Sequence, residues 1–236
     1  MTRAQSNVVG VALLLGTVVL SLASLTASVG LVVDSNAATA DATRVATDMN
    51  RAFSPVESTG VHRGRISFSK GRLETAEREL RIVDESGVVR AISVDALVFT
   101  GGDRRIAYVA GSVVRGTNDS ARIDTRPPIT ASRDGGVLVV GAVKLNASER
   151  IVVSKTGTPA LVRTNVTHTR TTLGNGTYRV AIETETATAW RRYFERQNAT
   201  TTMRDFDDDG VPSIVARYPG RRFAYLVVHD MRTEVQ

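Results

Sequence analysis

The sequence predicts an α+β protein, in which a long N-terminal hydrophobic helix precedes an antiparallel, β-rich meander or sandwich-like head with one packed helix. Three observations predict it: a charge-free apolar run near the N-terminus, many short β-patterned segments separated by turn residues, and one late segment with aromatic residues at helical spacing. The 236 residues suit one domain with an appendage. We therefore expect an N-terminal helix that ends near residue 55 and a β-rich domain at 56–236.

The composition excludes several classes of site. The chain has no cysteine, which rules out disulfides, thiolate metal sites and cysteine nucleophiles. Its three histidines, His62, His168 and His229, are far apart in sequence and none has a paired ligand spacing, so we expect no zinc site. The net charge is +6, but acidic residues are interleaved with the arginines, as in residues 74–79. Without a basic cluster, nucleic acid is not expected as a partner.

The apolar run predicts a membrane span. No charged residue occurs from Gln5 through Val33. Residues 8–33 would form a helix of about 39 Å, against a hydrocarbon core of about 30 Å, so membrane lipid is an expected partner. The amine and Arg3 lie on the short side, while the first charge beyond the run is Asp34. The positive-inside rule then predicts a single-pass protein of the cell membrane, with a cytoplasmic N-terminus and an extracellular C-terminal domain.

Small residues recur along this helix and would let another helix approach closely. They are Gly10, Gly16, Ser21, Ser24, Thr26, Ser28 and Gly30. This pattern permits self-association, or packing against other subunits, through residues 8–33. An isolated single-pass anchor accounts for the same composition.

The residues just before the run carry a more specific signal. Arg3-Ala4-Gln5-Ser6-Asn7-Val8-Val9-Gly10, leading into the apolar helix, resembles the N-termini of archaeal, particularly haloarchaeal, type IV pilin-like proteins. The resemblance implies that residues 1–4 form a short leader, which a prepilin peptidase removes by cutting between Ala4 and Gln5. The helix at 5–55 then stays on the mature protein as anchor and assembly element, in a surface filament. Bacterial pilins typically carry glutamate at the fifth mature position, where this chain has Val9. Archaeal relatives often lack that glutamate.

A second cleavage pattern stays open. Ala38-Thr39-Ala40 before Asp41 has the Ala-X-Ala form of a signal peptidase site, and cleavage there would release a soluble secreted protein. The apolar run is, however, longer than a secretory signal needs.

The remaining sequence predicts a second stretch of helix and then strands. Val45, Met49 and Phe53 have helical spacing, so the membrane helix is expected to continue through a short linker to residue 53 and to end at Ser54-Pro55. Strands are predicted at 65–69, 72–75, 79–83, 88–94, 96–99, 105–110, 137–143, 151–153, 161–164, 169–172, 178–182, 214–218 and 223–229. Residues 116–133 are expected to form a surface loop.

Turn residues and aromatic spacing predict three local features of the head. Asn175-Gly176 predicts a hairpin between 169–172 and 178–182, and Pro219-Gly220 a turn between the last two strands. Aromatic spacing predicts a helix at 186–197 with Trp190 in the core. The tract 107–115 and the segment 190–194 also resemble larger haloarchaeal pilin-like proteins.

The sequence predicts N-glycosylation of the surface. Asn-X-Ser/Thr sequons at Asn118, Asn146, Asn165, Asn175 and Asn198 take five of the seven asparagines beyond the membrane segment, where between about one and two are expected by chance. This excess favours an exported, N-glycosylated surface.

An acidic turn gives the only metal-like pattern. Asp205, Asp207 and Asp209 alternate before a glycine, as in the first half of an EF-hand loop, but Ala216 stands where that loop needs its bidentate glutamate. An EF-hand is rejected, and a weak Ca²⁺ contact and a solvated acidic turn remain as alternatives. No other cofactor is expected.

The sequence contains none of the standard catalytic motifs. A nucleophile elbow, a phosphate-binding glycine loop and a zinc-protease helix are all lacking, so we expect no enzyme. Two functions remain: a minor or accessory type IV pilin-like structural subunit, or a glycosylated binding or adhesion module held at the cell surface by one span.

Overall fold

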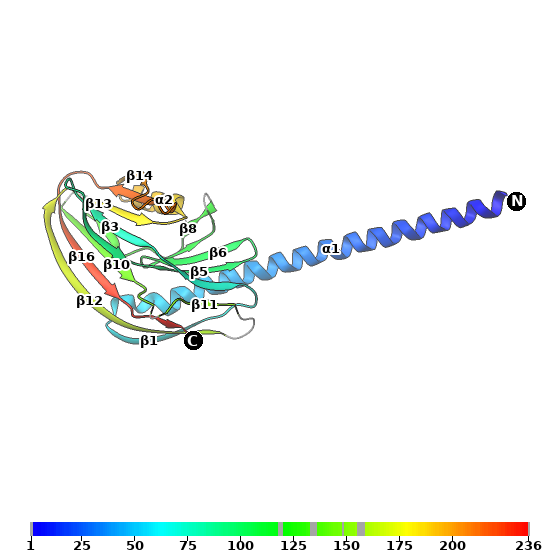
Figure 1. Ribbon diagram of the computed structural model, residues 1–236, viewed down its shortest axis with the longest axis horizontal. Coiled ribbons are helices and arrows are strands. Elements are labelled where there is room, and N and C mark those ends of the chain that lie inside the picture. Colours follow the sequence, from blue (N-terminus) through cyan, green and yellow to red (C-terminus); the bar gives the residue numbers. More distant parts are fainter. Residues whose placement is uncertain (1, 118–119, 133–135, 148, 155–158, 236) are drawn as a thin grey trace. The chain divides into compact units, whose positions relative to one another are not determined.

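The computed structural model describes residues 2–117, 120–132, 136–147, 149–154 and 159–235, with side chains from residue 10 onward (Figure 1). The chain divides into two compact units, residues 1–40 and residues 41–236. The first unit is helical, and the second combines antiparallel strands with a short helix. The predicted α+β class is therefore confirmed.

The first unit belongs to helix α1 (Thr2–Phe53). Within the described residues α1 is the one helix long and apolar enough to cross a membrane. Several of its hydroxyl groups donate to backbone carbonyls in the preceding turn: Thr17 Oγ1 lies 2.9 Å from the oxygen of Leu13, and Ser24 Oγ lies 2.9 Å from that of Leu20. These donors are therefore satisfied within the helix, as a lipid environment requires.

The C-terminal part of α1 belongs to the second unit, the head. Val45, Met49 and Phe53 are buried there, as their spacing predicts, and Phe53 stacks on Tyr108 with ring centroids 4.3 Å apart. The predicted linker is wrong, because α1 continues unbroken to Phe53. A 3-10 helix, η1 (Ser54–Glu57), with Pro55 at its start, ends it.

The head contains three sheets. The first, here the β12 sheet, has the order β1 (Gly60–Ile66), β12 (Ala160–Gly176), β16 (Arg222–Asp230), β10 (Val137–Lys144), β9 (Ile129–Ala131), with β17 (Glu234–Val235) also paired to β12. The second, the β5 sheet, has the order β11 (Val152–Val153), β2 (Arg72–Ala76), β5 (Ala96–Gly101), β6 (Arg104–Val109), β7 (Ser112–Arg115), β8 (Arg122–Ile123). The third, the β13 sheet, has the order β14 (Thr200–Arg204), β15 (Ser213–Arg217), β13 (Arg179–Glu183), β3 (Glu79–Val83), β4 (Val88–Ser93).

The central strands of the β5 sheet are buried on both faces, because they lie between two hydrophobic cores. On strand β5, Leu97 and Phe99 belong to the core that contains the end of α1, while Ala96 and Val98 belong to the core that contains the β13 sheet and helix α2 (Ala187–Glu195). Successive residues of a strand point to opposite faces, so one strand serves both cores. This accounts for its nearly continuous apolar sequence.

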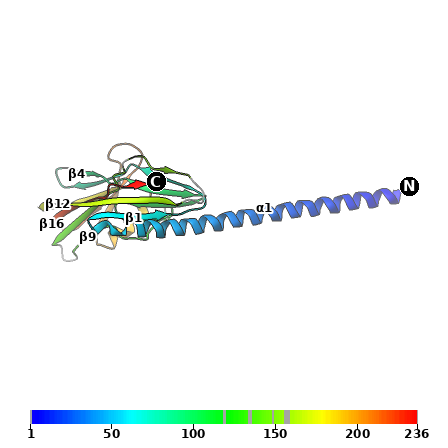
Figure 2. The same ribbon diagram turned by 90° about the horizontal axis from the view of Figure 1, so that it is seen from below.

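Strand β1 runs along β12 and lies close to the end of α1 (Figure 2). A Cβ atom added to Gly64 of β1 would stand 2.5 Å from the Cβ of Ala52. The glycine and the alanine together therefore permit this close approach between helix and strand.

Helix α2 confirms the predicted helix in type, position and burial. Trp190 is fully buried, and the hydroxyl of Tyr193 donates to the carbonyl of Ile129 on β9 over 2.7 Å. The amide of Gln197, just beyond the helix, accepts from the backbone N–H of Ala131 at 3.1 Å and donates to the Ile129 carbonyl at 3.2 Å. The helix is thus fixed to an edge of the β12 sheet.

The predicted strand partners were wrong in two places. The hairpin across Asn175-Gly176 does not form, because β12 continues to Gly176 and pairs with β16, while β13 pairs with β3 and β15. The chain does turn at Pro219-Gly220, but β15 and β16 enter different sheets. Strands β10 and β16 are parallel, and the predicted surface loop at 116–133 contributes β8 and β9. In each case tertiary burial decided the partner.

Candidate functional site

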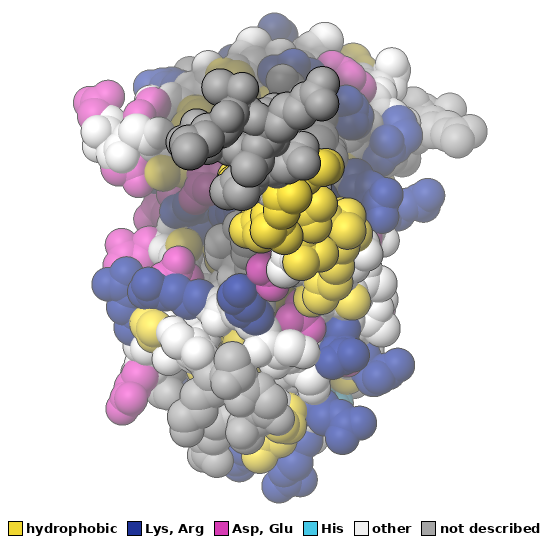
Figure 3. Space-filling model, turned by 90° about the vertical axis from the view of Figure 1, so that its right-hand side faces the viewer, with side chains coloured by type: hydrophobic (Ala, Val, Ile, Leu, Met, Phe, Trp, Pro, Cys, Tyr) yellow, Lys and Arg dark blue, Asp and Glu magenta, His cyan; other side chains and the backbone are white. Residues whose placement is uncertain are grey.

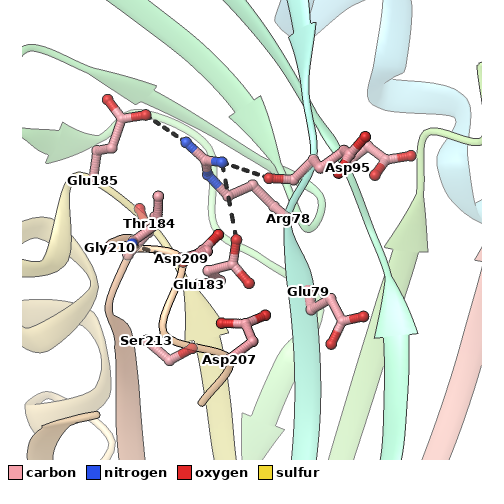
Figure 4. Close-up of polar contacts among 12 residues, drawn as sticks. Arg78, Glu79, Asp95, Glu183, Thr184, Glu185, Asp207, Asp209, Gly210 and Ser213 are labelled. Atoms are coloured by element: carbon pink, nitrogen blue, oxygen red, sulfur yellow. Dashed lines mark hydrogen bonds and ion pairs between the residues drawn. The ribbon is translucent and has the colours of Figure 1, made fainter. Parts of the chain in front are cut away.

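The acidic turn lies beside a network of arginines and carboxylates at one end of the β13 sheet (Figure 4). Three carboxylates offer oxygens within 4.8 Å of one another: those of Glu183, Asp207 and Asp209. Asp205 belongs to a different arrangement. Its two oxygens accept the backbone N–H groups of Asp208 at 3.0 Å and Gly210 at 3.1 Å, so this side chain shapes the turn.

Arg81 supplies positive charge to these carboxylates. Its Nη2 lies 2.7 Å from Asp207 Oδ2 and its Nη1 lies 3.3 Å from Glu183 Oε2. A third partner, Glu79, is 2.9 Å away. The guanidinium also stands over the ring of Phe206 at 5.0 Å. Because the positive charge comes from the chain, the arrangement is an internal ion-pair network and does not require a calcium ion.

A second arginine extends the network. Arg78 pairs with Glu185 and lies 3.9 Å from Glu183, and Arg105 lies 3.1 Å from Glu185. Burial raises the pKa of Glu183, and Asp209 adds to the rise, while Arg78 and Arg81 oppose it. Burial disfavours the charged form of Arg105 as well and so lowers its pKa, while the negative charge of Glu185 raises it.

Removal of Arg81 is expected to destabilise the head. Glu183 is buried, and the substitution Arg81→Met leaves its carboxylate without its closest cation. Breaking a buried pair from one side typically costs about 3 kcal/mol or more. We expect a loss near the lower end of that scale, because Arg78 remains and Asp207 is largely exposed. Urea unfolding followed by far-UV circular dichroism measures the change.

The double variant Arg81→Met with Glu183→Gln is the matched control. It removes the buried negative charge together with its partner, so it should recover a large part of the lost stability. Equal unfolding free energies for the single and double variants would contradict this account.

The predicted sequons lie on the surface wherever the structure describes them. Asn165 and Asn175 are exposed on β12, and Asn198 is exposed in the turn before β14 with φ of 62°. Asn146 is also exposed, but its Nδ2 donates to Asp230 Oδ1 over 2.7 Å. Asn118 lies outside the described residues. Asn165, Asn175 and Asn198 thus present exposed side-chain amides within the described part of the chain.

The predicted processing residues lie in the first turns of α1. Ala4 and Gln5 are helical in backbone, and their side chains lie outside the described atoms.

Charged side chains on the head are interspersed, with basic and acidic groups side by side over the face seen in Figure 3.

The sequence missed one pairing of titratable side chains. His168 and His229 lie opposite each other on β12 and β16, and their Nδ1 atoms are 3.0 Å apart. The distance between these two histidines in the sequence does not predict their contact in the fold. A separation of 61 residues gives no local signal; only the register of two strands brings the rings together.

Comparison with known proteins identifies a family without assigning an activity. Neither a curated protein nor a solved structure matches the chain. A family of unknown function, DUF7289, matches residues 3–234, which is almost the whole chain. The protein therefore belongs to the DUF7289 family.

Proposed function

We propose that this protein is a type IV pilin-like subunit of the cell surface, of the minor or accessory kind. The observation that carries the proposal is the single unbroken helix α1, whose first part is apolar and exposed and whose last part is buried in the head core. One helix can then serve first as membrane anchor and later as assembly element. The N-terminal sequence that resembles a prepilin cleavage site supports the same interpretation.

The proposed mechanism is assembly. A prepilin peptidase cuts between Ala4 and Gln5, the helix stays in lipid with the head outside the cell, and small residues on α1 let helices of neighbouring subunits pack closely. The side chains of Val18, Leu22 and Leu25 are more than half exposed within the described chain, so lipid or other helices can cover them. N-glycans on Asn165, Asn175 and Asn198 would keep sugars on the outer surface of the head.

The mature N-terminus tests this function. The full-length chain is expressed in an archaeal host that has a prepilin peptidase, and the purified protein is analysed by mass spectrometry. We expect it to begin at Gln5. The variant Ala4→Arg should leave it uncleaved, because a bulky charge replaces a small residue at the cut, while the added positive charge preserves the membrane orientation.

Thr39→Arg is the matched control, since it adds the same side chain beyond the apolar run and should still be cut at Gln5. A wild-type protein that begins at Met1 would contradict the proposal and favour the anchored binding module. One that begins at Asp41 would favour secretion and contradict both membrane functions.

A further inference from the structure

The two paired histidines form a compact donor site on the β12 sheet. His168 of β12 and His229 of β16 are direct neighbours across the two antiparallel strands. Their ring centroids lie 4.9 Å apart and the ring planes are inclined by 85°. The two Nδ1 atoms face each other at 3.0 Å.

The sheet buries one ring and exposes the other. His229 is 8% exposed, whereas His168 is open to solvent. A metal ion can therefore reach the pair from the side of His168.

Metal ions bind imidazole in its neutral form, through the ring nitrogen that carries a lone pair.

We propose that His168 and His229 bind one divalent transition-metal ion through their two Nδ1 atoms, copper(II) in preference to zinc(II). With metal–nitrogen bonds of about 2.0–2.1 Å, a nitrogen separation of 3.0 Å corresponds to an angle of about 94° at the metal. This is close to the right angle between neighbouring ligands in tetragonal copper(II) sites and well below the tetrahedral angle of zinc sites. The general order of affinities of divalent metals for nitrogen ligands also places copper(II) above zinc(II).

Binding leaves the proton count of the pair unchanged. In the metal-free protein one Nδ1 carries the proton that lies between the two rings. When the metal binds, that ring loses the proton from Nδ1 to solvent and takes one at Nε2. The exposure of His168 permits this exchange. Water fills the remaining coordination positions.

Copper titration of the full-length protein, purified in detergent with a histidine-free tag, tests the site. We expect one copper(II) ion per chain, an electron paramagnetic resonance spectrum with nitrogen couplings, and a thermal midpoint that rises with copper concentration. Zinc should bind at least about tenfold more weakly. The variant His168→Asn should weaken copper binding at least about tenfold and abolish the rise in midpoint.

The third histidine gives the matched control. His62 is remote in register from the pair, and its Nε2 contacts the carbonyl of Ser58 at 2.8 Å. The variant His62→Asn should bind copper as the wild type does. Metal-free melting curves show whether each variant folds, and His168→Gln replaces His168→Asn if that variant does not. Equal copper affinity in the wild type and the His168 variant, or tighter binding of zinc than of copper, would overturn the proposal.

Discussion

Membrane retention is expected to be lost when Val18 and Leu22 are both replaced by arginine. The two residues lie one turn apart on α1, and they are 59% and 62% exposed, so neither packs within the described chain. An arginine at the centre of a spanning helix costs about 2.5–3.5 kcal/mol in insertion experiments, and two cost about 5–7 kcal/mol if the terms add. The double variant should therefore appear in the soluble fraction after an alkaline wash of membranes, whereas the wild type should stay in the pellet.

The control for this experiment is Thr39→Arg, which adds charge to the same helix beyond the charge-free run. It should remain in the membrane pellet. Retention of the Val18→Arg, Leu22→Arg variant would mean that α1 does not cross the bilayer as a single lipid-facing helix. Helix formation itself should not change, because arginine is a good helix former.

Truncation of Trp190 is expected to give the largest loss of stability in the head. The side chain is fully buried on α2, with its ring centroid 6.0 Å from that of Phe194 and 6.4 Å from that of Tyr193. Replacing a buried tryptophan by alanine leaves a cavity and typically costs about 3–5 kcal/mol. Urea unfolding of the full-length protein in detergent, followed by far-UV circular dichroism, should show Trp190→Ala unfolding at a clearly lower urea concentration.

Trp190→Phe separates packing from hydrogen bonding. The indole Nε1 has no hydrogen-bond partner within the described residues, so phenylalanine removes ring volume without breaking a hydrogen bond to any of them. We expect it to lose less than half as much stability as Trp190→Ala. Equal losses for the two variants would show that the cavity does not dominate.

The sequence predicted which segments form helices and strands better than it predicted which strands pair with one another. The charge-free run and the aromatic spacing predicted α1 and α2 because these signals are local. The partners of β12 were not predictable in this way, since the Asn175-Gly176 dipeptide favours a hairpin that the burial of β13 between β3 and β15 overrides. Local turn preference contributes less free energy than burying a strand on both faces.

The same distinction applies to the candidate sites. Asp207 and Asp209 stand two residues apart in an acidic turn that the sequence shows directly. Their buried partner Glu183 and the cation Arg81 come from strands far away in the sequence. The histidine pair depends entirely on the register of β12 with β16. The exposed sequons could be predicted, because an asparagine in a polar, β-patterned segment usually lies at the surface.

The pairing of β12 has a consequence for the order in which the head can fold. Strand β1, made early in synthesis, needs residues 160–166 as its neighbour, and the same stretch of β12 also pairs with β17 near the C-terminus. Closing such long loops is slow, because much chain entropy is lost before the contacts form. A nascent chain therefore leaves β1 unpaired until residues 160–166 have emerged from the ribosome, and the sheet is complete only when β17, at the end of the chain, has followed.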